Sequence, residues 1–311
     1  MSKFLGLVLA VLFGFSINAQ AVAPIVSFPP PNDSGWIKLF RGNNNDDFYS
    51  HDAQTKRGLF PNATFQNRDS VVAVTGTPTG HFAFKQPLSY YHLRFKQRHV
   101  KDGNSGALLH IREDENGLGV YPRSVELQGN TDGTGELWTI GDVWVDVPVV
   151  NPSARPPVYK EGGTIMQHGN SDDRQCRGSS NPMKAIGEWD VLEAFVYGAD
   201  SMRHVVNGVT VIAYKKVRVS PSPDDYTKPL NSGVIGFQSE GAEVWYKDIE
   251  VKLMPQDPIY AEVYKGTTSV KSETNLNGAT HKSAATPVHD LTGRIKAKSK
   301  KIKLNTSRLN F

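Results

Sequence analysis

The chain has 311 residues, 38% of them hydrophobic and 21% charged, and it is long enough for one large β domain plus extra pieces. Its formal net charge is +4, but residues 265–311 hold ten basic and two acidic side chains and so contribute +8, which leaves −4 on the first 264 residues. This mildly acidic body argues against a nucleic acid as a partner, because phosphate binding requires a basic face on the folded part.

The first 21 residues have the features of a secretory signal peptide. Lys3 precedes an unbroken apolar run over residues 4–15, and small residues follow where cleavage would occur. The run is too short to span a bilayer of roughly 30 Å as a helix, and no second run is long enough. No cysteine follows the cleavage region to carry a lipid anchor. We therefore expect a secreted or periplasmic protein without an integral membrane segment.

The body of the chain has the pattern of an all-β sandwich. Short runs rich in β-branched and aromatic residues alternate with clusters of Gly, Pro, Asn and Asp. Between two of these runs, Asn207-Gly208 predicts a tight hairpin, since both residues tolerate positive φ. The predicted strands lie near residues 71–76, 90–100, 105–113, 123–129, 136–147, 188–198, 202–217, 232–241 and 242–254.

Two regions depart from this pattern. Residues 148–184 are rich in Pro, Gly, Ser and Asn, and predict a long irregular insertion. Residues 255–311 lose the hydrophobic periodicity and predict a basic linker or tail. Within the tail, "PVHDLTGRIKAK" (residues 287–298) is similar to the middle of a C-terminal sorting or attachment segment of secreted bacterial proteins. The closing glycine-rich strand of such a segment is missing, so a solvated basic tail is the alternative.

The run "RSVELQG" holds the first candidate site residues. Strand side chains alternate between the two faces of a sheet, so Glu126 and Gln128 share one face while Val125 and Leu127 share the other. The apolar pair belongs in a core. The polar pair is then either a solvated surface or part of a site.

Other strands carry polar pairs in the same arrangement. His110 and Arg112 share a face of the run 105–113, and Gln238 and Glu240 share a face of the run 232–241. Glu188 stands directly before a tryptophan that could stack on a sugar ring. That residue, Trp189, is nevertheless expected in the core together with Trp36 and Trp245, because large aromatics anchor sandwiches.

Six sequence segments, in order, resemble the 3-keto-disaccharide hydrolase family of exported bacterial domains. They cover about 220 of the 311 residues, and neither the insertion nor the tail is among them. The segments are "GWIKLFRGNNNDDFY" from Gly35, "GNSGALLHIRE", "SVELQ", "GEWD" from Gly187, "VNGV" and "SGVIGFQSEGAEVWYKDIEV". The resemblance implies a concanavalin A-like jelly roll of two packed antiparallel sheets over residues 22–254, with the ligand on the concave face of one sheet.

The same resemblance implies an enzyme that cleaves 3-keto-glycosides, with an oligosaccharide or glycoside as substrate. A ketone at C3 acidifies the proton on C2, so a base can remove it and expel the group on C1 by β-elimination, after which water can add to the double bond. Such a reaction requires a general base, a donor for the enolate oxygen and a proton source for the leaving oxygen.

The polar strand residues supply these roles. We expect Glu126 as acid or base, Arg112 as stabiliser of the enolate oxygen, and His110 as base, acid or metal ligand. The expected substrate-binding residues are Gln128, Gln238, Glu240 and Glu188.

Two alternatives stay open at this point. A non-catalytic glycan-binding module is one, because fold alone does not decide function. A retaining glycosidase is the other, but the Glu-x-Asp-x-x-Glu arrangement that glycanases of this fold use is absent, since Glu126 is followed by Gln128. A divalent cation such as calcium is also left open, with Asp46, Asp47, Asp172 and Asp173 as oxygen ligands in no recognisable spacing.

Overall fold

The computed structural model describes residues 24–54, 56–112, 117–169, 173–220 and 222–265. The predicted signal peptide and the tail beyond Lys265 lie outside these ranges, so export and sorting stay predictions. Within them, no helix is long and apolar enough to cross a membrane. The helices of the described residues are η1 (Asn45–Asp47) and α1 (Tyr260–Tyr264), and nearly all other regular structure is β-strand.

The larger of two sheets has ten strands, and every neighbouring pair in it runs antiparallel. Strand β1 (Ile37–Lys38) pairs with β18 at one side of the main order. The order is β12 (Thr164–His168), β11 (Val143–Val149), β16 (Val209–Val219), β15 (Ser201–Val206), β14 (Asp190–Tyr197), β7 (Tyr90–His99), β18 (Val244–Leu253), β5 (Val71–Val74) and β4 (Phe65–Arg68).

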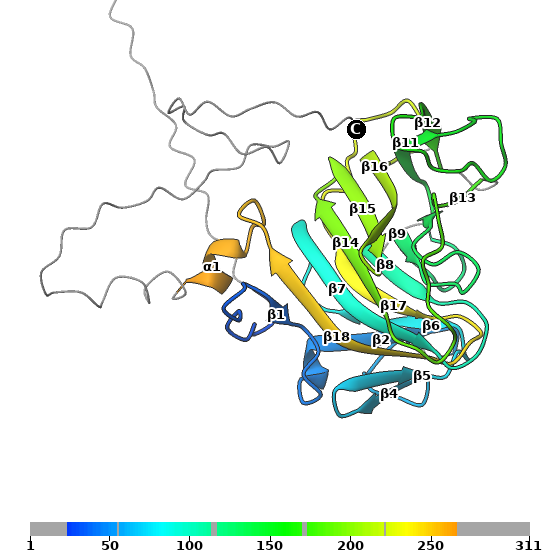
Figure 1. Cartoon of the computed structure of the whole chain (residues 1–311). Coiled ribbons are helices and arrows are strands. Elements are labelled where there is room, and N and C mark those ends of the chain that lie inside the picture. The colour runs from blue at the N-terminus through cyan, green and yellow to red at the C-terminus, as the bar shows by residue number, and fades with distance from the viewer. Residues whose placement is uncertain (1–23, 55, 113–116, 170–172, 221, 266–311) are drawn as a thin grey trace, which may run out of the picture. The chain divides into compact units, whose positions relative to one another are not determined.

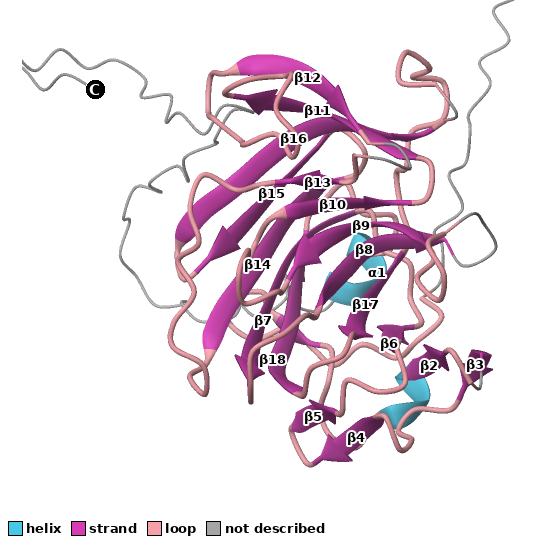
Figure 2. Ribbon diagram, turned by 90° about the vertical axis from the view of Figure 1, so that its right-hand side faces the viewer, coloured by secondary structure: helices cyan, strands magenta, loops and turns pink. Residues whose placement is uncertain are grey.

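The smaller sheet has eight strands, also antiparallel throughout. Figure 1 shows it behind the larger sheet, and Figure 2 shows its strands following one another from β13 to β3. The order is β13 (Gln175–Cys176), β10 (Leu137–Ile140), β9 (Arg123–Gln128), β8 (Gly106–Arg112), β17 (Val234–Ser239), β6 (Gly80–Phe84), β2 (Phe48–Asp52) and β3 (Lys56–Gly58).

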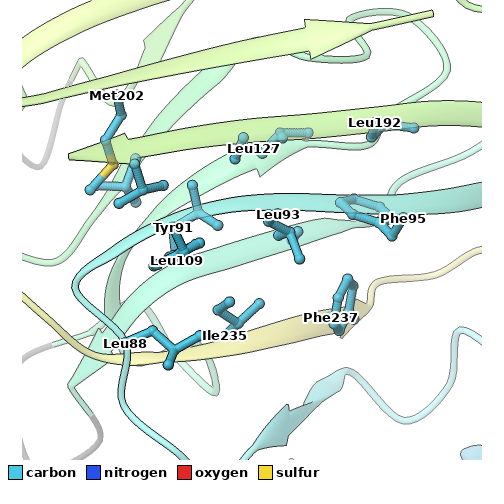
Figure 3. Close-up of a cluster of buried hydrophobic side chains, with 14 of the residues drawn as sticks. Leu88, Tyr91, Leu93, Phe95, Leu109, Leu127, Leu192, Met202, Ile235 and Phe237 are labelled. Atoms are coloured by element: carbon cyan, nitrogen blue, oxygen red, sulfur yellow. The ribbon is translucent and has the colours of Figure 1, made fainter. Parts of the chain in front are cut away.

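The core fills the space between the sheets. Leu93 and Phe95 of β7 meet Leu127 of β9 and Phe237 of β17 there, all fully buried (Figure 3). Each such side chain contributes roughly 1.5–3 kcal/mol by leaving water, and the alternation of the strands brings every second residue to this layer. The predicted all-β sandwich of two antiparallel sheets is therefore confirmed.

The eight-stranded sheet also buries side chains on its other side, which we call the outer face. Tyr49, Leu108, Ile111, Tyr121 and Ile140 form a second apolar cluster there, separate from the core. All six residues of β9 are buried as a result. Polar side chains that β9 sends to the outer face therefore lie in a covered environment rather than in water.

The Asn207-Gly208 hairpin is confirmed. Both residues have positive φ, 49° and 81°, and they join β15 to β16. The side chain of Asn207 also accepts a hydrogen bond from the backbone N–H of Val191 (2.9 Å) and donates one to Asp190 (2.6 Å). The turn is thus tied to the neighbouring strand β14.

The segment 148–184 is more regular than predicted. It holds β12, which pairs with β11 at one edge of the larger sheet, and β13, which pairs with β10 at one edge of the smaller sheet. Pro148 lies near the end of β11 itself, whereas Pro152, Pro156 and Gly162 lie in the connection between β11 and β12.

The tryptophans predicted for the core lie elsewhere. Trp36, Trp189 and Trp245 are half-buried on the exposed side of the ten-stranded sheet. The guanidinium of Arg94 lies 4.0 Å from the Trp36 ring, and that of Arg98 lies 4.1 Å from the Trp245 ring and 5.1 Å from the Trp189 ring. Cation–π stacking covers these rings in place of the second sheet.

The folded unit continues past residue 254, where the sequence pattern placed its end. The Asp257 carboxylate accepts hydrogen bonds from the backbone N–H groups of Ser89 (2.8 Å) and Tyr90 (3.1 Å), and Ile259 is 2% exposed within the core. The Tyr264 hydroxyl donates to the carbonyl of Gly35 (2.7 Å). The sequence pattern did not mark this extension as folded, because its helix, α1, has only five residues and is too short to give a clear hydrophobic period.

These contacts separate two truncations. Removal of residues 266–311 should leave the melting temperature nearly unchanged, whereas removal of residues 255–311 should lower it by at least about 5 °C, because it exposes the core around Ile259. Thermal unfolding followed by circular dichroism measures both. Loss of cooperative unfolding in the protein that lacks only residues 266–311 would contradict this boundary.

Candidate functional site

Glu126 is the most deeply buried acid of the outer face. It projects from the middle of β9, is 4% exposed, and pairs across the sheet with Leu108 of β8 and Trp138 of β10. Gly106 makes room for it. A Cβ at Gly106 would lie 2.8 Å from Glu126 Oε1 and 2.6 Å from Gln238 Oε1, so any larger residue would displace both side chains.

Glu240 is the second acid of this site. It directly follows β17, is half-buried, and forms a β-bridge with Asn104, whose side chain also hydrogen-bonds to the Glu240 carboxylate. Its charge acts on Glu126 strongly enough to raise the pKa of that carboxyl. Two carboxyl groups therefore share one covered region, and no positive charge stands among the groups that shift the pKa of either.

Burial raises the pKa of both carboxyls, and the charge of Glu240 adds to the shift at Glu126. Burial raises the pKa of Glu126 well above its ordinary value of 4.5, and the nearby Glu240 raises it further. A hydrogen bond from the Gln238 amide offsets only part of this rise. Burial also raises the pKa of Glu240, to about 7, although Asn104 lowers it. At neutral pH the pair thus holds a proton on the deeper Glu126, while Glu240 gains and loses one.

Tyr121 covers the pair. Its hydroxyl donates a hydrogen bond to the carbonyl of Ser239 (2.8 Å), and the residue is 8% exposed. Burial, and then the charges of Glu240 and Glu126, raise the pKa of Tyr121 far above its usual range. The phenol therefore stays protonated and remains a hydrogen-bond donor at every pH in which the protein works.

A pocket of about 430 Å³ opens on the β10 side of the pair, within the size range of small-ligand sites. Its walls are mostly amides and acids. They consist of Asn104, Gln128, Asn130, Asp132, Gly133, Glu136, Trp138, Gln175 and Arg177. Gln128 faces it from β9, the strand of Glu126, and Trp138 faces it from the neighbouring β10, so the pocket continues from the carboxyl pair.

The opposite side of the pair has a different character. Gln238 pairs across the sheet with His81 of β6, which pairs with His51 of β2. The Tyr49 ring meets His81 edge-on at 6.1 Å between centroids, and the Arg57 guanidinium lies 4.1 Å from the Tyr49 ring. This half of the outer face is therefore basic and aromatic.

Four of the predicted site residues come together as expected. Glu126, Gln128, Gln238 and Glu240 lie on one face of the sheet, on the two strands that flank β8, because the period-2 alternation holds along β9 and β17. Gln128 has a structural task as well, since its Oε1 accepts hydrogen bonds from the backbone N–H groups of Gly129 (2.9 Å) and Asn130 (3.0 Å).

The prediction that His110 and Arg112 line the same pocket is wrong. A β-bulge interrupts β8 between Leu109 and Arg112, and His110 has a φ of 53°. The extra residue reverses the alternation. His110 therefore points into the core, where its ring meets Tyr91 of the other sheet and its Nδ1 donates to Leu230 O (2.9 Å).

The remaining properties of these two residues follow from the bulge. Burial lowers the pKa of His110 to about 4, so the ring is neutral at pH 7. Arg112 ends β8 with an exposed side chain and pairs across the sheet with Arg123 rather than with an acid of the site. Neither lies within the group formed by Glu126 and Glu240.

Glu188 also lies apart from the site. It is exposed in the turn before β14, a strand of the ten-stranded sheet, and its neighbour Trp189 stacks under Lys247 at 4.1 Å on the exposed side of that sheet. Glu188 therefore does not join the group around Glu126, because β14 belongs to the other sheet.

Four residues of the site were missed. Trp138 could have been found, since it alternates with the core residue Leu137 on a predicted strand. Asn104, Tyr121 and His81 carried no such signal. The first two lie in connections, whose path the sequence does not specify, and His81 lies in a strand that was not predicted.

Two of the four aspartates considered for calcium have other partners. Asp47 accepts hydrogen bonds from Arg41 (3.3 Å) and Asn44 (2.6 Å), and Asp173 pairs with Arg155 (3.0 Å). Asp172 lies outside the described residues. Across the part of the chain that the structure describes, no group of three or more His, Cys, Asp or Glu side chains is placed to hold a metal ion.

Comparison with known protein families decides where the chain belongs. The family model of the 3-keto-alpha-glucoside-1,2-lyase-like domain matches residues 35–252. The chain is a member of this family. The match spans both sheets and every residue of the site described above, and it confirms the resemblance that the sequence segments carried. A search of curated proteins found no match to this chain.

Several solved structures resemble the lyase-like chain. A candidate glycosyl hydrolase from Parabacteroides distasonis ATCC 8503 is 17% identical, with 71% of this chain and 94% of that chain covered and a TM-score of 0.46. The carbohydrate-binding module CBM66 from Bacillus subtilis is 10% identical, with 61% and 91% covered and a TM-score of 0.36. Beta-agarase A from Zobellia galactanivorans is 13% identical, with 62% and 76% covered and a TM-score of 0.36.

The buried Glu126 predicts a pH-dependent stability of the lyase-like domain. Above about pH 4.5 the unfolded chain releases a proton that folded Glu126 keeps, so the free energy of unfolding falls as the pH rises. Glu126→Gln removes this effect. It should stabilise the protein by on the order of 1–2 kcal/mol at pH 8 and by little at pH 4, as measured by urea unfolding.

The matched control is Glu188→Gln, which neutralises an exposed glutamate far from the pair. It should change the free energy of unfolding by less than about 0.5 kcal/mol at both pH values. If Glu126→Gln destabilises the protein equally at pH 4 and pH 8, Glu126 is not protonated in the folded state.

Proposed function

We propose that this protein cleaves 3-keto-glycosides by β-elimination, followed by addition of water. The observation that supports this most is the covered carboxyl pair, in which one acid keeps its proton and the other titrates near neutral pH. Titratable groups with shifted pKa values in a covered site are typical of acid–base catalysis, and membership of the lyase-like family agrees with the reaction.

The pKa values assign the two roles. Glu240, with a pKa of about 7, suits the general base that removes the proton from C2, because a base works best when its pKa is near the working pH. Glu126, with a pKa raised well above 4.5, suits the general acid that gives its proton to the leaving oxygen. This assignment refines the sequence-based one, in which Glu126 alone was acid or base.

In the elimination step, Glu240 takes the C2 proton and the C2–H electron pair forms the enolate with the C3 ketone. The enolate then reforms the ketone as the C1–O bond breaks, which leaves a double bond between C1 and C2. The leaving oxygen takes its proton from Glu126. The Gln238 amide is a donor already in place beside Glu126, and we assign stabilisation of the enolate oxygen to it in place of Arg112.

Water then adds across the double bond. Its oxygen bonds to C1, one of its protons returns to the carboxylate of Glu126, and C2 receives the proton that Glu240 had taken. Both acids are thereby restored, and the net reaction is hydrolysis of the glycosidic bond. The elimination and the addition of water need no oxidant, since the substrate already carries the ketone.

A non-catalytic glycan-binding module is the second candidate. The observation that favours it is the amide-rich pocket with a tryptophan in its wall, which would suit a sugar whether or not a bond is cleaved. We also propose, from the predicted signal peptide alone, that the protein acts outside the cytoplasm.

Two variants separate acid from base. Glu240→Gln should lower elimination from every 3-keto-glucoside by roughly 10²-fold or more. Glu126→Gln should lower elimination by a similar factor when the leaving group is an alkyl alcohol or a sugar. The loss should be much smaller for p-nitrophenolate, which departs without a proton. Product formation followed by chromatography and by p-nitrophenolate absorbance measures both, with Glu188→Gln as the control at the parent rate.

The same assay includes the unoxidised parent glycosides. Turnover of these by the wild-type protein would point to a conventional glycosidase. If no 3-keto sugar is cleaved while intact glycans bind, or if both Gln variants keep the parent rate, the elimination mechanism is wrong and the binding module replaces it.

A further inference from the structure

The carboxyl pair divides the outer face into two chemically different halves. On the β6 side lie His81, His51 and Arg57, which suit developing negative charge. On the β10 side lies the pocket of about 430 Å³ with amide and acid walls. An unsymmetrical substrate that crosses the pair has two orientations, and the two halves are different enough to select one of them.

The pocket presents fixed donors. Because Gln128 Oε1 already accepts two backbone N–H groups (2.9 and 3.0 Å), its amide NH₂ is left to donate. The indole N–H of Trp138 is buried and has no acceptor among the described residues. A buried donor without a partner costs about 1–3 kcal/mol, so a ligand oxygen here would be stabilising.

The pocket also presents acceptors. Glu136 is 8% exposed and uses Oε2 to accept a hydrogen bond from the Gln175 amide (2.7 Å), and Asp132 stands in the same wall. A sugar hydroxyl both donates and accepts, so neighbouring hydroxyls match alternating donors and acceptors. A phosphate or sulfate would meet two acidic side chains against the single basic Arg177, and an apolar ring would leave the buried donors unpaired.

The pocket is continuous with the proposed reaction site. Asn104 contributes to its wall and also hydrogen-bonds to Glu240, while Trp138 is the cross-strand neighbour of Glu126. A group held in the pocket would therefore begin beside the acid that protonates the leaving oxygen, whereas the enolate side would face Gln238 and His81.

We propose that this pocket binds the group expelled from C1, and that it selects an uncharged, hydroxyl-rich group such as a second sugar over an aromatic or anionic one. Trp138, Gln128 and Glu136 are the residues that make the selection. The orientation rests on the proposed function, because only cleavage defines a leaving group, but the preference for a sugar unit concerns the pocket alone.

A binding measurement tests the pocket without any turnover. The indole N–H resonances of the five tryptophans are recorded by ¹⁵N NMR, and Trp138→Phe assigns the one from Trp138. Glucose should shift the Trp138 resonance, while phenol and inorganic sulfate should not. If glucose leaves it unmoved, or if phenol or sulfate shifts it instead, the pocket does not select a sugar.

A kinetic measurement tests the orientation. The ratio of kcat/KM for a 3-keto-disaccharide to that for methyl 3-keto-glucoside should fall about fivefold in Trp138→Phe, the effect of one lost hydrogen bond. Trp245→Phe, on the exposed side of the other sheet, should leave the ratio unchanged. An unchanged ratio in Trp138→Phe would overturn the leaving-group assignment.

The binding and the cleavage measurements test different claims, so one can fail without the other. A glucose-dependent shift without cleavage of any 3-keto sugar would refute the proposed function and leave a sugar-binding pocket. Cleavage without the shift would keep the proposed function and refute the pocket assignment.

Discussion

Strand β9 is buried on both faces, and the site depends on this constraint. Its inner residues Val125 and Leu127 fill the core between the sheets, so strand alternation sends Glu126 and Gln128 to the outer face. There the apolar cluster around Leu108 and Tyr121 excludes water from Glu126. A carboxyl in such a position cannot ionise at its ordinary pH, because burial penalises the charged form.

Packing against the ten-stranded sheet offsets the free-energy cost of the buried Glu126. Its ten strands bury the inner faces of both sheets in one large core, so the fold tolerates a buried acid that lowers its stability above pH 4.5. The charge of Glu240 adds to this cost, because it further disfavours ionisation of Glu126. A pair of this kind, with one proton held and one exchanged near pH 7, is more useful for chemistry than for stability.

Sequence periodicity predicted the parts of the molecule in which a strand is regular. It placed Glu126 with Gln128 and Gln238 with Glu240, because β9 and β17 keep their alternation there. It failed at His110, since one extra residue in a bulge reverses the face and no pattern marks the bulge. It failed at Glu188, because periodicity does not say to which of two sheets a strand belongs.

The tryptophans show the same limit. Hydrophobicity placed Trp36, Trp189 and Trp245 in the core, but arginine side chains cover them on the exposed side of the larger sheet. Tyr121 and Asn104 reach the site from connections, whose paths are set by tertiary packing. The fold could therefore be predicted from the sequence, while only half of the site could.

The central claim is that Glu126 and Glu240 hold different protonation states at neutral pH. Carbon-13 NMR of the side-chain carboxyls in protein labelled at glutamate, with Glu126→Gln and Glu240→Gln to assign the two signals, measures this directly. Glu240 should titrate with a midpoint of about 7, and Glu126 should remain protonated beyond that midpoint. Titration of both near the ordinary value of 4.5 would contradict the account.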